Sequence, residues 1–241
     1  MKVCIIGNSH TGALKRAWDT FFDSNFKNIF DLTFFASRAQ RLEGLKIEGT
    51  KLIPQNEYLK ENLKFTSGGK PYVDLSLYDV FLVYGLSTRP YFLSKVFYSE
   101  AVLIKSIEDN HTSSLSFKIL TMIRDVVDTK TFIGHDPLRV NKDRDGIEFD
   151  KVLTEQYSLG ISLVNESLFF PLGAELLEQP QQTIVGKGRN THSIYSKGSK
   201  RLDVGDEKDG ELHPESDNRH MNDEFGKIWL ESFLGRLKSE L

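Results

Sequence analysis

The sequence predicts an α/β fold in which helices cover a mainly parallel β-sheet. Short apolar runs rich in β-branched and aromatic residues alternate with segments of helical periodicity, an order that is typical of βαβ units. The runs are apolar at successive positions, so both faces of the sheet are expected to be buried. With 39% hydrophobic residues, the chain of 241 residues can bury a large core.

Four strands are expected from runs of consecutive apolar, β-prone residues. The first, KVCII, is followed at once by Gly7, and the third, VFLVY, by Gly85. The predicted strands are residues 2–6, 32–36, 80–84 and 131–133.

Helices are expected between and after these strands. The first is indicated by apolar residues at i, i+3, i+4, i+7 and i+8, which are Leu14, Ala17, Trp18, Phe21 and Phe22. Further helices are predicted at about 92–108, 113–127 and 151–168. In the last helix Asn222 stands at the expected N-cap, and acidic residues follow in the first turn, where the helix dipole favours them.

We expect a single domain spanning 1–241, with insertions near 37–78 and 185–218. The first insertion has the pattern of short strands or hairpins around Gly68-Gly69, and residues 141–150 have that of a charged surface loop. The second is polar and rich in glycine. It is either a floppy surface loop or an excursion that carries the residues after it to the edge of a pocket.

Composition excludes several classes of function. The net charge of −3 gives no electrostatic reason to bind nucleic acid or an anionic membrane. One cysteine, Cys4, rules out an internal disulfide framework and a Cys-based zinc site, and no metal or other cofactor is expected. No apolar run is long enough for a signal peptide or a spanning helix, so a cytoplasmic location is expected. The oligomeric state is left open.

The turn after the first strand, Gly7-Asn8-Ser9-His10, is the first candidate site. Ser9 is expected near the N-terminus of a helix, where free N–H groups stabilise negative charge, and this suits either a nucleophile or a simple N-cap. A Walker loop fails because Ala13 and Leu14 replace Lys and Ser/Thr. The dinucleotide fingerprint is weakened because Ser9 replaces its middle glycine, although Asp31 has the right spacing for a ribose contact. Thr11 breaks the Gly-x-Ser-x-Gly elbow.

The second candidate lies just before the last helix, at Asp217-Asn218-Arg219-His220. A serine nucleophile needs a histidine base that is oriented by a carboxylate, and Asp217 and His220 are three residues apart. An exposed or helix-capping histidine is the alternative interpretation of His220.

Together the two stretches resemble the SGNH (also called GDSL) hydrolase family, whose first block is Gly-Asp-Ser or a close variant and whose last is Asp-x-x-His. In this chain Asn8 replaces the Asp of the first block. The resemblance implies a three-layer α/β/α sandwich of the flavodoxin-like kind and hydrolysis of esters by a serine triad. By match, Ser9 is the nucleophile, His220 the base and Asp217 its orienter.

The resemblance also implies an oxyanion hole with three hydrogen-bond donors, which are the Ser9 N–H, a Gly N–H after the second strand and an Asn side chain after the third. This chain departs from the pattern, because Ser37 and Ser87 stand where Gly and Asn are expected. Loss of one oxyanion donor costs about 100- to 1000-fold in rate, so either another group donates or the enzyme is slow or specialised. Further contacts with substrate are expected from His10, Gly85, Arg89 and His135.

The sequence therefore predicts a serine hydrolase that cleaves small-acyl, acetyl-type esters, with a small-molecule or carbohydrate ester as substrate. The carbohydrate part rests on the family resemblance. Three alternatives stay open: an acyltransferase that moves an acyl group to a polysaccharide sugar, a nucleotide-binding module that uses Gly7 to Gly12, and a non-catalytic carbohydrate-binding protein.

Overall fold

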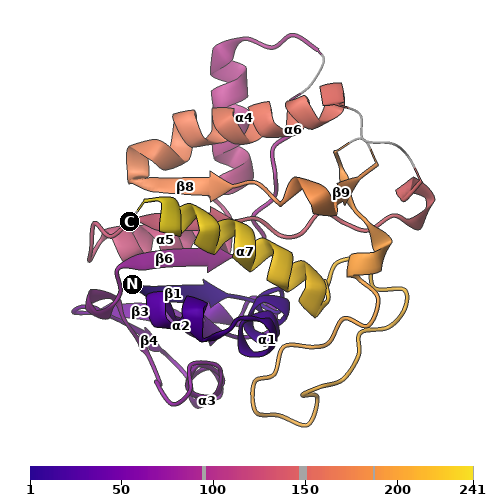
Figure 1. Ribbon diagram of the computed structural model, residues 1–241. Coiled ribbons are helices and arrows are strands. Elements are labelled where there is room, and N and C mark those ends of the chain that lie inside the picture. Colours follow the sequence, from indigo (N-terminus) through magenta and orange to yellow (C-terminus); the bar gives the residue numbers. More distant parts are fainter. Residues whose placement is uncertain (94–95, 147–150, 187, 241) are drawn as a thin grey trace.

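Five parallel strands form the central sheet of the computed structural model, which describes residues 1–93, 96–146, 151–186 and 188–240. Their order across the sheet is β2-β1-β6-β7-β8, and every neighbouring pair is parallel. In Figure 1 the arrows of β1, β6 and β8 point in the same direction. The strands are β1 (Lys2–Gly7), β2 (Asp31–Ala36), β6 (Val80–Tyr84), β7 (Thr131–Gly134) and β8 (Ala174–Leu177). The four strands expected from the sequence are present, and the predicted α/β fold is confirmed.

Helices cover both faces of this sheet, because successive side chains of each strand point to opposite faces. Val3 and Ile5 of β1 belong to a core shared with the helices of one face, and Cys4 and Ile6 to a second core on the other face. The first face carries α1 (Thr11–Phe21), α2 (Ser24–Ile29) and α7 (Asp223–Ser239). The second carries α3 (Glu57–Thr66), α4 (Glu100–His111), α5 (Leu115–Arg124) and α6 (Lys151–Val164). The molecule is thus a three-layer α/β/α sandwich.

The strand order contains one reversal. The chain runs from β1 to β2 on one side and then returns to β6 on the other side of β1. In open parallel sheets, ligands bind beyond the carboxyl ends of the strands at such a switch point. The ends of β1 and β6 therefore mark the expected crevice, and they lead into Asn8-Ser9 and Gly85-Leu86 respectively.

Several predicted helix boundaries need correction. The helix expected at 92–108 begins only at Glu100, because Ser99 takes the extended N-cap conformation and Glu100 occupies the favourable first turn. The helix expected at 113–127 is the shorter α5, and Ser114 caps it by accepting a hydrogen bond from the Phe117 N–H. The helix expected at 151–168 ends at Val164, after which the chain continues as a wider π-type turn, Asn165–Phe169.

Sequence patterns also missed three α-helices or strands that are longer than two residues. The short helix α2 begins at Ser24, capped by Asp23. Strand β8 has the sequence AELL, whose residues favour helices, and it becomes a strand by pairing with β7. The third missed element is the helix α3, which lies within the segment where short strands or hairpins were expected.

The 37–78 segment is a small antiparallel sheet interrupted by α3. Its strands are β3 (Leu45–Glu48), β4 (Lys51–Pro54) and β5 (Val73–Asp74). A hairpin was expected around Gly68 and Gly69, but these two glycines instead end α3. The Gly69 N–H donates to the Lys64 carbonyl over 2.7 Å.

Two arginines tie the 185–218 segment to the rest of the fold. Arg16 of α1 donates to the carbonyls of Lys200 and Arg201. Arg38, which follows β2, donates to the Leu202 carbonyl and pairs with Asp206 and Asp209. These contacts favour the excursion over a floppy loop. Apart from β9 (Ile184–Val185), β10 (Asn190–Thr191) and a short turn at Ser193–Tyr195, the described part of the segment is irregular.

The charged stretch at 141–150 is partly described. Residues 142–144 form a single 3-10 turn on the surface, whereas the prediction for 147–150 lies outside the described residues. No helix in the described part of the chain has both the length and the apolar character needed to cross a membrane.

Candidate active site

Ser9 lies in a tight turn between β1 and α1. The Thr11 N–H donates to the Asn8 carbonyl over 3.0 Å, and the Gly12 N–H donates to the Ser9 carbonyl over 3.2 Å. The side-chain oxygen of Asn8 accepts the His10 N–H as well. Because His10 occupies the N-cap of α1, Ser9 stands at the positive end of that helix. The turn thus fixes the Ser9 hydroxyl at the carboxyl edge of the sheet.

A chain of two hydrogen bonds joins Ser9 to the other end of the sequence. Ser9 Oγ lies 2.9 Å from His220 Nε2, and His220 Nδ1 lies 2.9 Å from Asp217 Oδ2. The second oxygen of Asp217 accepts the N–H groups of Arg219 and His220, each over 2.8 Å. The carboxylate is therefore held rigidly, and it selects the tautomer in which Nδ1 carries the proton and Nε2 accepts from Ser9.

Asp217 is ionised at neutral pH. Burial acts to raise the pKa of this carboxyl, but the hydrogen bonds from the His220 and Arg219 N–H groups, and that from the His220 ring, hold it at about 2. A charged carboxylate at this position stabilises a protonated imidazole on His220.

The His220 ring is stacked between two other histidines. Its centroid lies 4.9 Å from that of His10 and 3.9 Å from that of His213, whose ring is nearly parallel to it at 9°. Burial, followed by the proximity of His220, lowers the pKa of His10 to about 3 and that of His213 to about 4. Both neighbours are therefore neutral at pH 7, and among the three rings only that of His220 is hydrogen-bonded to a carboxylate.

His213 was not assigned to the site from the sequence. It reaches His220 because its N–H donates to the Ser199 carbonyl, which folds residues 211–214 back over the Asp217 turn. This long-range pairing leaves no local pattern that would have revealed it.

His213, Asp217 and His220 also group three potential metal ligands within 4.8 Å of one another. The stacking of the two rings does not suit a shared ion, because nitrogen lone pairs lie in the ring plane and those of parallel stacked rings cannot converge on one point. A metal on His220 Nδ1 would also displace the hydrogen bond to Asp217. The group is better explained as a carboxylate hydrogen-bonded to the His220 ring, on which the His213 ring is stacked, than as a metal centre.

The three expected oxyanion donors differ in whether other groups of the protein already accept their hydrogen bonds. Among the described residues none accepts the Ser9 N–H. The Ser37 N–H donates to the Gly7 carbonyl over 3.3 Å, which continues the β1–β2 ladder, and its hydroxyl donates to Asn62 inside the protein. The Ser87 N–H donates to Asp136, but its hydroxyl accepts from Gln40 and keeps its own hydrogen for another acceptor. Ser9 and Ser87 are therefore available as donors, and Ser37 is not.

The expected substrate contacts are likewise divided. His10 and Arg89 line one cavity of about 530 Å³ beside the Ser9 turn, together with Ser87. Gly85 does not line this cavity but shapes it: its φ is +76°, and a Cβ there would lie 2.6 Å from the side-chain oxygen of Asn8. His135 is buried, and its ring nitrogens are bound by the Tyr157 hydroxyl and the Asp136 carbonyl. Asp136 rather than His135 faces the cavity.

No family model matches this chain. No curated protein matches its sequence either. Among solved structures it is similar to a gut microbial diltiazem-metabolizing enzyme, BT4096, with a TM-score of 0.32 and 10% sequence identity. The similarity covers 76% of this chain and 37% of that enzyme, so the chain spans little more than a third of its length. A likeness this low carries no argument, and the case for function rests on the geometry of the site.

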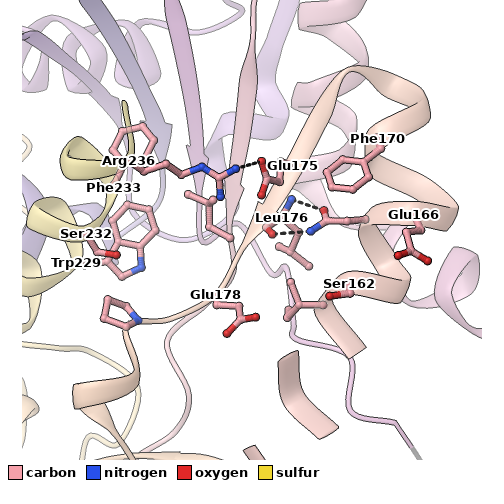
Figure 2. Close-up of a pocket in the computed structure, with 14 residues that line it drawn as sticks. Ser162, Glu166, Phe170, Glu175, Leu176, Glu178, Trp229, Ser232, Phe233 and Arg236 are labelled. Atoms are coloured by element: carbon pink, nitrogen blue, oxygen red, sulfur yellow. Dashed lines mark hydrogen bonds and ion pairs between the residues drawn. The ribbon is translucent and has the colours of Figure 1, made fainter. Parts of the chain in front are cut away.

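A second hollow of about 380 Å³ lies at the edge strand β8, and its lining shares no residue with the triad (Figure 2). Glu175 pairs with Arg236 there, and Glu166 and Glu178 also face it. The amide of Asn165 donates to the Leu176 carbonyl and accepts the Leu176 N–H, so it occupies backbone groups on the open edge of the sheet (Figure 2). This hollow has no nucleophile–base pair among the described residues.

Proposed function

We propose that this protein is a serine hydrolase that cleaves small-acyl esters through a covalent acyl-enzyme. The observation that carries the proposal is the hydrogen-bonded series Ser9–His220–Asp217, which joins residues 211 positions apart. A serine, a histidine and a carboxylate with the histidine between the other two is the arrangement that activates a hydroxyl as a nucleophile.

In the first half of the reaction, Ser9 Oγ attacks the ester carbonyl while its proton passes to His220 Nε2. The imidazolium so formed is stabilised by Asp217, whose low pKa keeps it charged. The oxyanion accepts hydrogen bonds from the Ser9 N–H, at the positive end of α1, and from the Ser87 hydroxyl. His220 then gives its proton to the leaving alcohol, which departs as the C–O bond breaks.

In the second half, a water molecule replaces the alcohol. His220 takes a proton from this water, the resulting hydroxide attacks the acyl carbon, and Ser9 regains its proton as the carboxylic acid leaves. No redox step or outside co-reactant other than water is needed.

The choice of acetyl-type esters, carried by a carbohydrate, rests on the resemblance of the two end blocks to SGNH hydrolases. The site itself supports the hydrolase part: a half-buried nucleophile, a base and free donors at the carboxyl edge of a parallel sheet.

The experiment is steady-state hydrolysis of p-nitrophenyl acetate by purified protein. Ser9→Ala should lower kcat by at least about 1000-fold, because the nucleophile is lost, and Asp217→Asn by about 100-fold or more, because His220 loses its orienting charge. Ser76→Ala, at an exposed serine away from the site, is the matched control and should retain full activity. Wild-type protein that hydrolyses no faster than Ser9→Ala would contradict the proposal.

A further inference from the structure

The cavity beside the Ser9 turn is lined by four arginines, Arg89, Arg139, Arg189 and Arg219. They come from four separate places in the sequence. Arg89 follows β6, Arg139 follows β7, Arg189 precedes β10, and Arg219 lies between the two triad residues Asp217 and His220. The net charge of the whole chain is −3, so the positive charge of these four arginines at one hollow is opposite in sign to that of the chain.

None of these guanidinium groups forms an ion pair with a described residue. In the described ranges, no carboxylate lies within ion-pair distance of any of the four, whereas Arg16, Arg38, Arg201 and Arg236 all have such partners. Arg189 instead lies over the ring of Phe92, with its guanidinium carbon 4.9 Å from the ring centroid.

Among the described residues that line the cavity, Asp136 is the one that is acidic. It accepts the Ser87 N–H and lies 3.8 Å from His10 Nε2. Burial raises its pKa to about 6, against the lowering effects of the Ser87 N–H and of Arg89, Arg219 and Arg139. With one carboxylate against four arginines, the described part of the cavity wall carries a net positive charge.

The cavity adjoins the proposed reaction centre. His10 belongs both to its wall and to the ring stack on His220, and Ser87 belongs both to its wall and to the proposed oxyanion donors. Its volume of about 530 Å³ is in the range of small-molecule sites, and Pro90, Phe92 and Leu138 add apolar surface. A group bound here would be part of the molecule whose ester reaches Ser9.

We propose that this cavity is a subsite for a phosphoryl group, so that the ester substrate is a phosphorylated small molecule such as an acylated sugar phosphate. The inference that this phosphoryl group belongs to the ester substrate rests on the proposed function. Arginine binds phosphate oxygens through two parallel N–H groups, and one phosphate offers several such oxygens and up to two charges. Four arginines around one hollow exceed what a single carboxylate needs. The gathering of these arginines at one local hollow differs from the extended basic stripe of a nucleic-acid surface.

The first test measures binding without catalysis. Inorganic pyrophosphate and phosphate are titrated calorimetrically into the Ser9→Ala protein at 150 mM salt. Pyrophosphate should bind with a Kd below about 1 mM, and the double variant Arg139→Gln/Arg219→Gln should weaken this binding at least tenfold. Arg41→Gln removes an exposed arginine outside the cavity and should leave the Kd unchanged.

Three results would overturn the assignment: no pyrophosphate binding, equal binding by the double variant, or tighter binding of glucuronate than of pyrophosphate and phosphate. The last would identify a carboxylate subsite instead.

The second test measures selectivity. The ratio of kcat/KM for an acetylated sugar phosphate to that for the unphosphorylated acetylated sugar should fall at least tenfold in the double variant, and it should be unchanged in Arg41→Gln. A ratio that the double variant leaves unaltered would contradict the subsite. Pyrophosphate binding by Ser9→Ala protein, together with no ester hydrolysis by the wild type, would instead refute the proposed function and leave an anion-binding site.

Discussion

Gly226 of α7 lies directly against the main chain of Ala13 in α1. A Cβ at residue 226 would stand 2.2 Å from the Ala13 carbonyl oxygen, which is closer than any side chain permits. Helix α1 begins just after Ser9, and α7 begins just after His220. The close crossing of these two helices therefore sets the distance between the Ser9 hydroxyl and the His220 ring.

Gly226→Ala should disturb this crossing. The added methyl must push α7 away from α1, which costs about 1–3 kcal/mol and lengthens the Ser9–His220 hydrogen bond. We expect a lower Tm, and a fall in kcat for p-nitrophenyl acetate that exceeds any change in KM.

Gly235→Ala is the matched control, because Gly235 lies in the same helix and a Cβ there meets nothing within 4 Å. It should raise stability by about 0.5–1 kcal/mol through helix propensity and leave kcat unchanged. Equal effects of the two substitutions would show that the crossing does not position the triad.

The hydroxyls of Ser87 and Ser37 should behave differently. Ser87→Ala removes a proposed oxyanion donor, so kcat should fall by about 100-fold with little change in Tm. Ser37→Ala removes a buried hydrogen bond to Asn62, so it should lower the Tm and leave the kcat of the folded protein nearly unchanged. Kinetics and thermal unfolding of both variants check this pair, and a Ser37→Ala protein that is folded but as slow as Ser87→Ala would reverse the assignment.

Arg38 should hold in place the part of the 185–218 segment that precedes Asp217. Its guanidinium pairs with Asp206 over 2.7 Å and with Asp209 over 2.9 Å. If Arg38→Ala costs about 1.4 kcal/mol of local stability, the open form becomes about tenfold more populated and trypsin should cleave near Lys208 about tenfold faster. Arg41→Ala, which alters an exposed arginine, should keep the wild-type cleavage rate.

Buried histidines should make the fold less stable in mild acid. Burial, followed by the proximity of His135, lowers the pKa of His111 to about 4, whereas an unfolded histidine titrates near 6.5. Between these pH values the unfolded chain binds the extra proton, so the contribution of His111 to stability is present at pH 7 and is lost as the pH falls toward 4. Burial lowers the pKa of His135 to about 4 as well. The raised pKa of Asp136 acts in the opposite direction between about 4 and 6.

His111→Leu isolates one member of this group. Both ring nitrogens of His111 are buried without a hydrogen-bond partner in the described part of the chain, so a leucine loses no such bond. We expect the fall in Tm between pH 7.5 and pH 5.0 to be smaller than in the wild type. His192→Asn, at a half-exposed histidine, should retain the full fall, and an unchanged fall in His111→Leu would contradict the prediction.

Local patterns were sufficient for much of the fold. Runs such as VFLVY are apolar at every position and match β6, and Asn222 caps the last helix as expected, accepting the Phe225 N–H over 3.1 Å. Patterns failed where tertiary pairing overrides local preference, as in β8, or where a short helix interrupts a group of strands, as α3 does.

The candidate site divides in the same way. Ser9, Asp217 and His220 could be proposed from the sequence because of their residue types and their places beside a strand or helix, and the structure brings the three side chains within hydrogen-bond distance. The state of Ser37 depends on whether a neighbouring carbonyl takes its N–H, and the place of His213 depends on how residues 211–214 fold back. The four arginines come from distant positions, and only the folded chain shows that they line one cavity.

The most direct test of Ser9 as an activated nucleophile is labelling with a fluorophosphonate probe at neutral pH, with the modified residue located by peptide mass spectrometry. We predict one adduct, on Ser9, which is absent in Ser9→Ala and forms about 100-fold more slowly in His220→Ala. An adduct on another residue, or no adduct on folded wild-type protein, would contradict it.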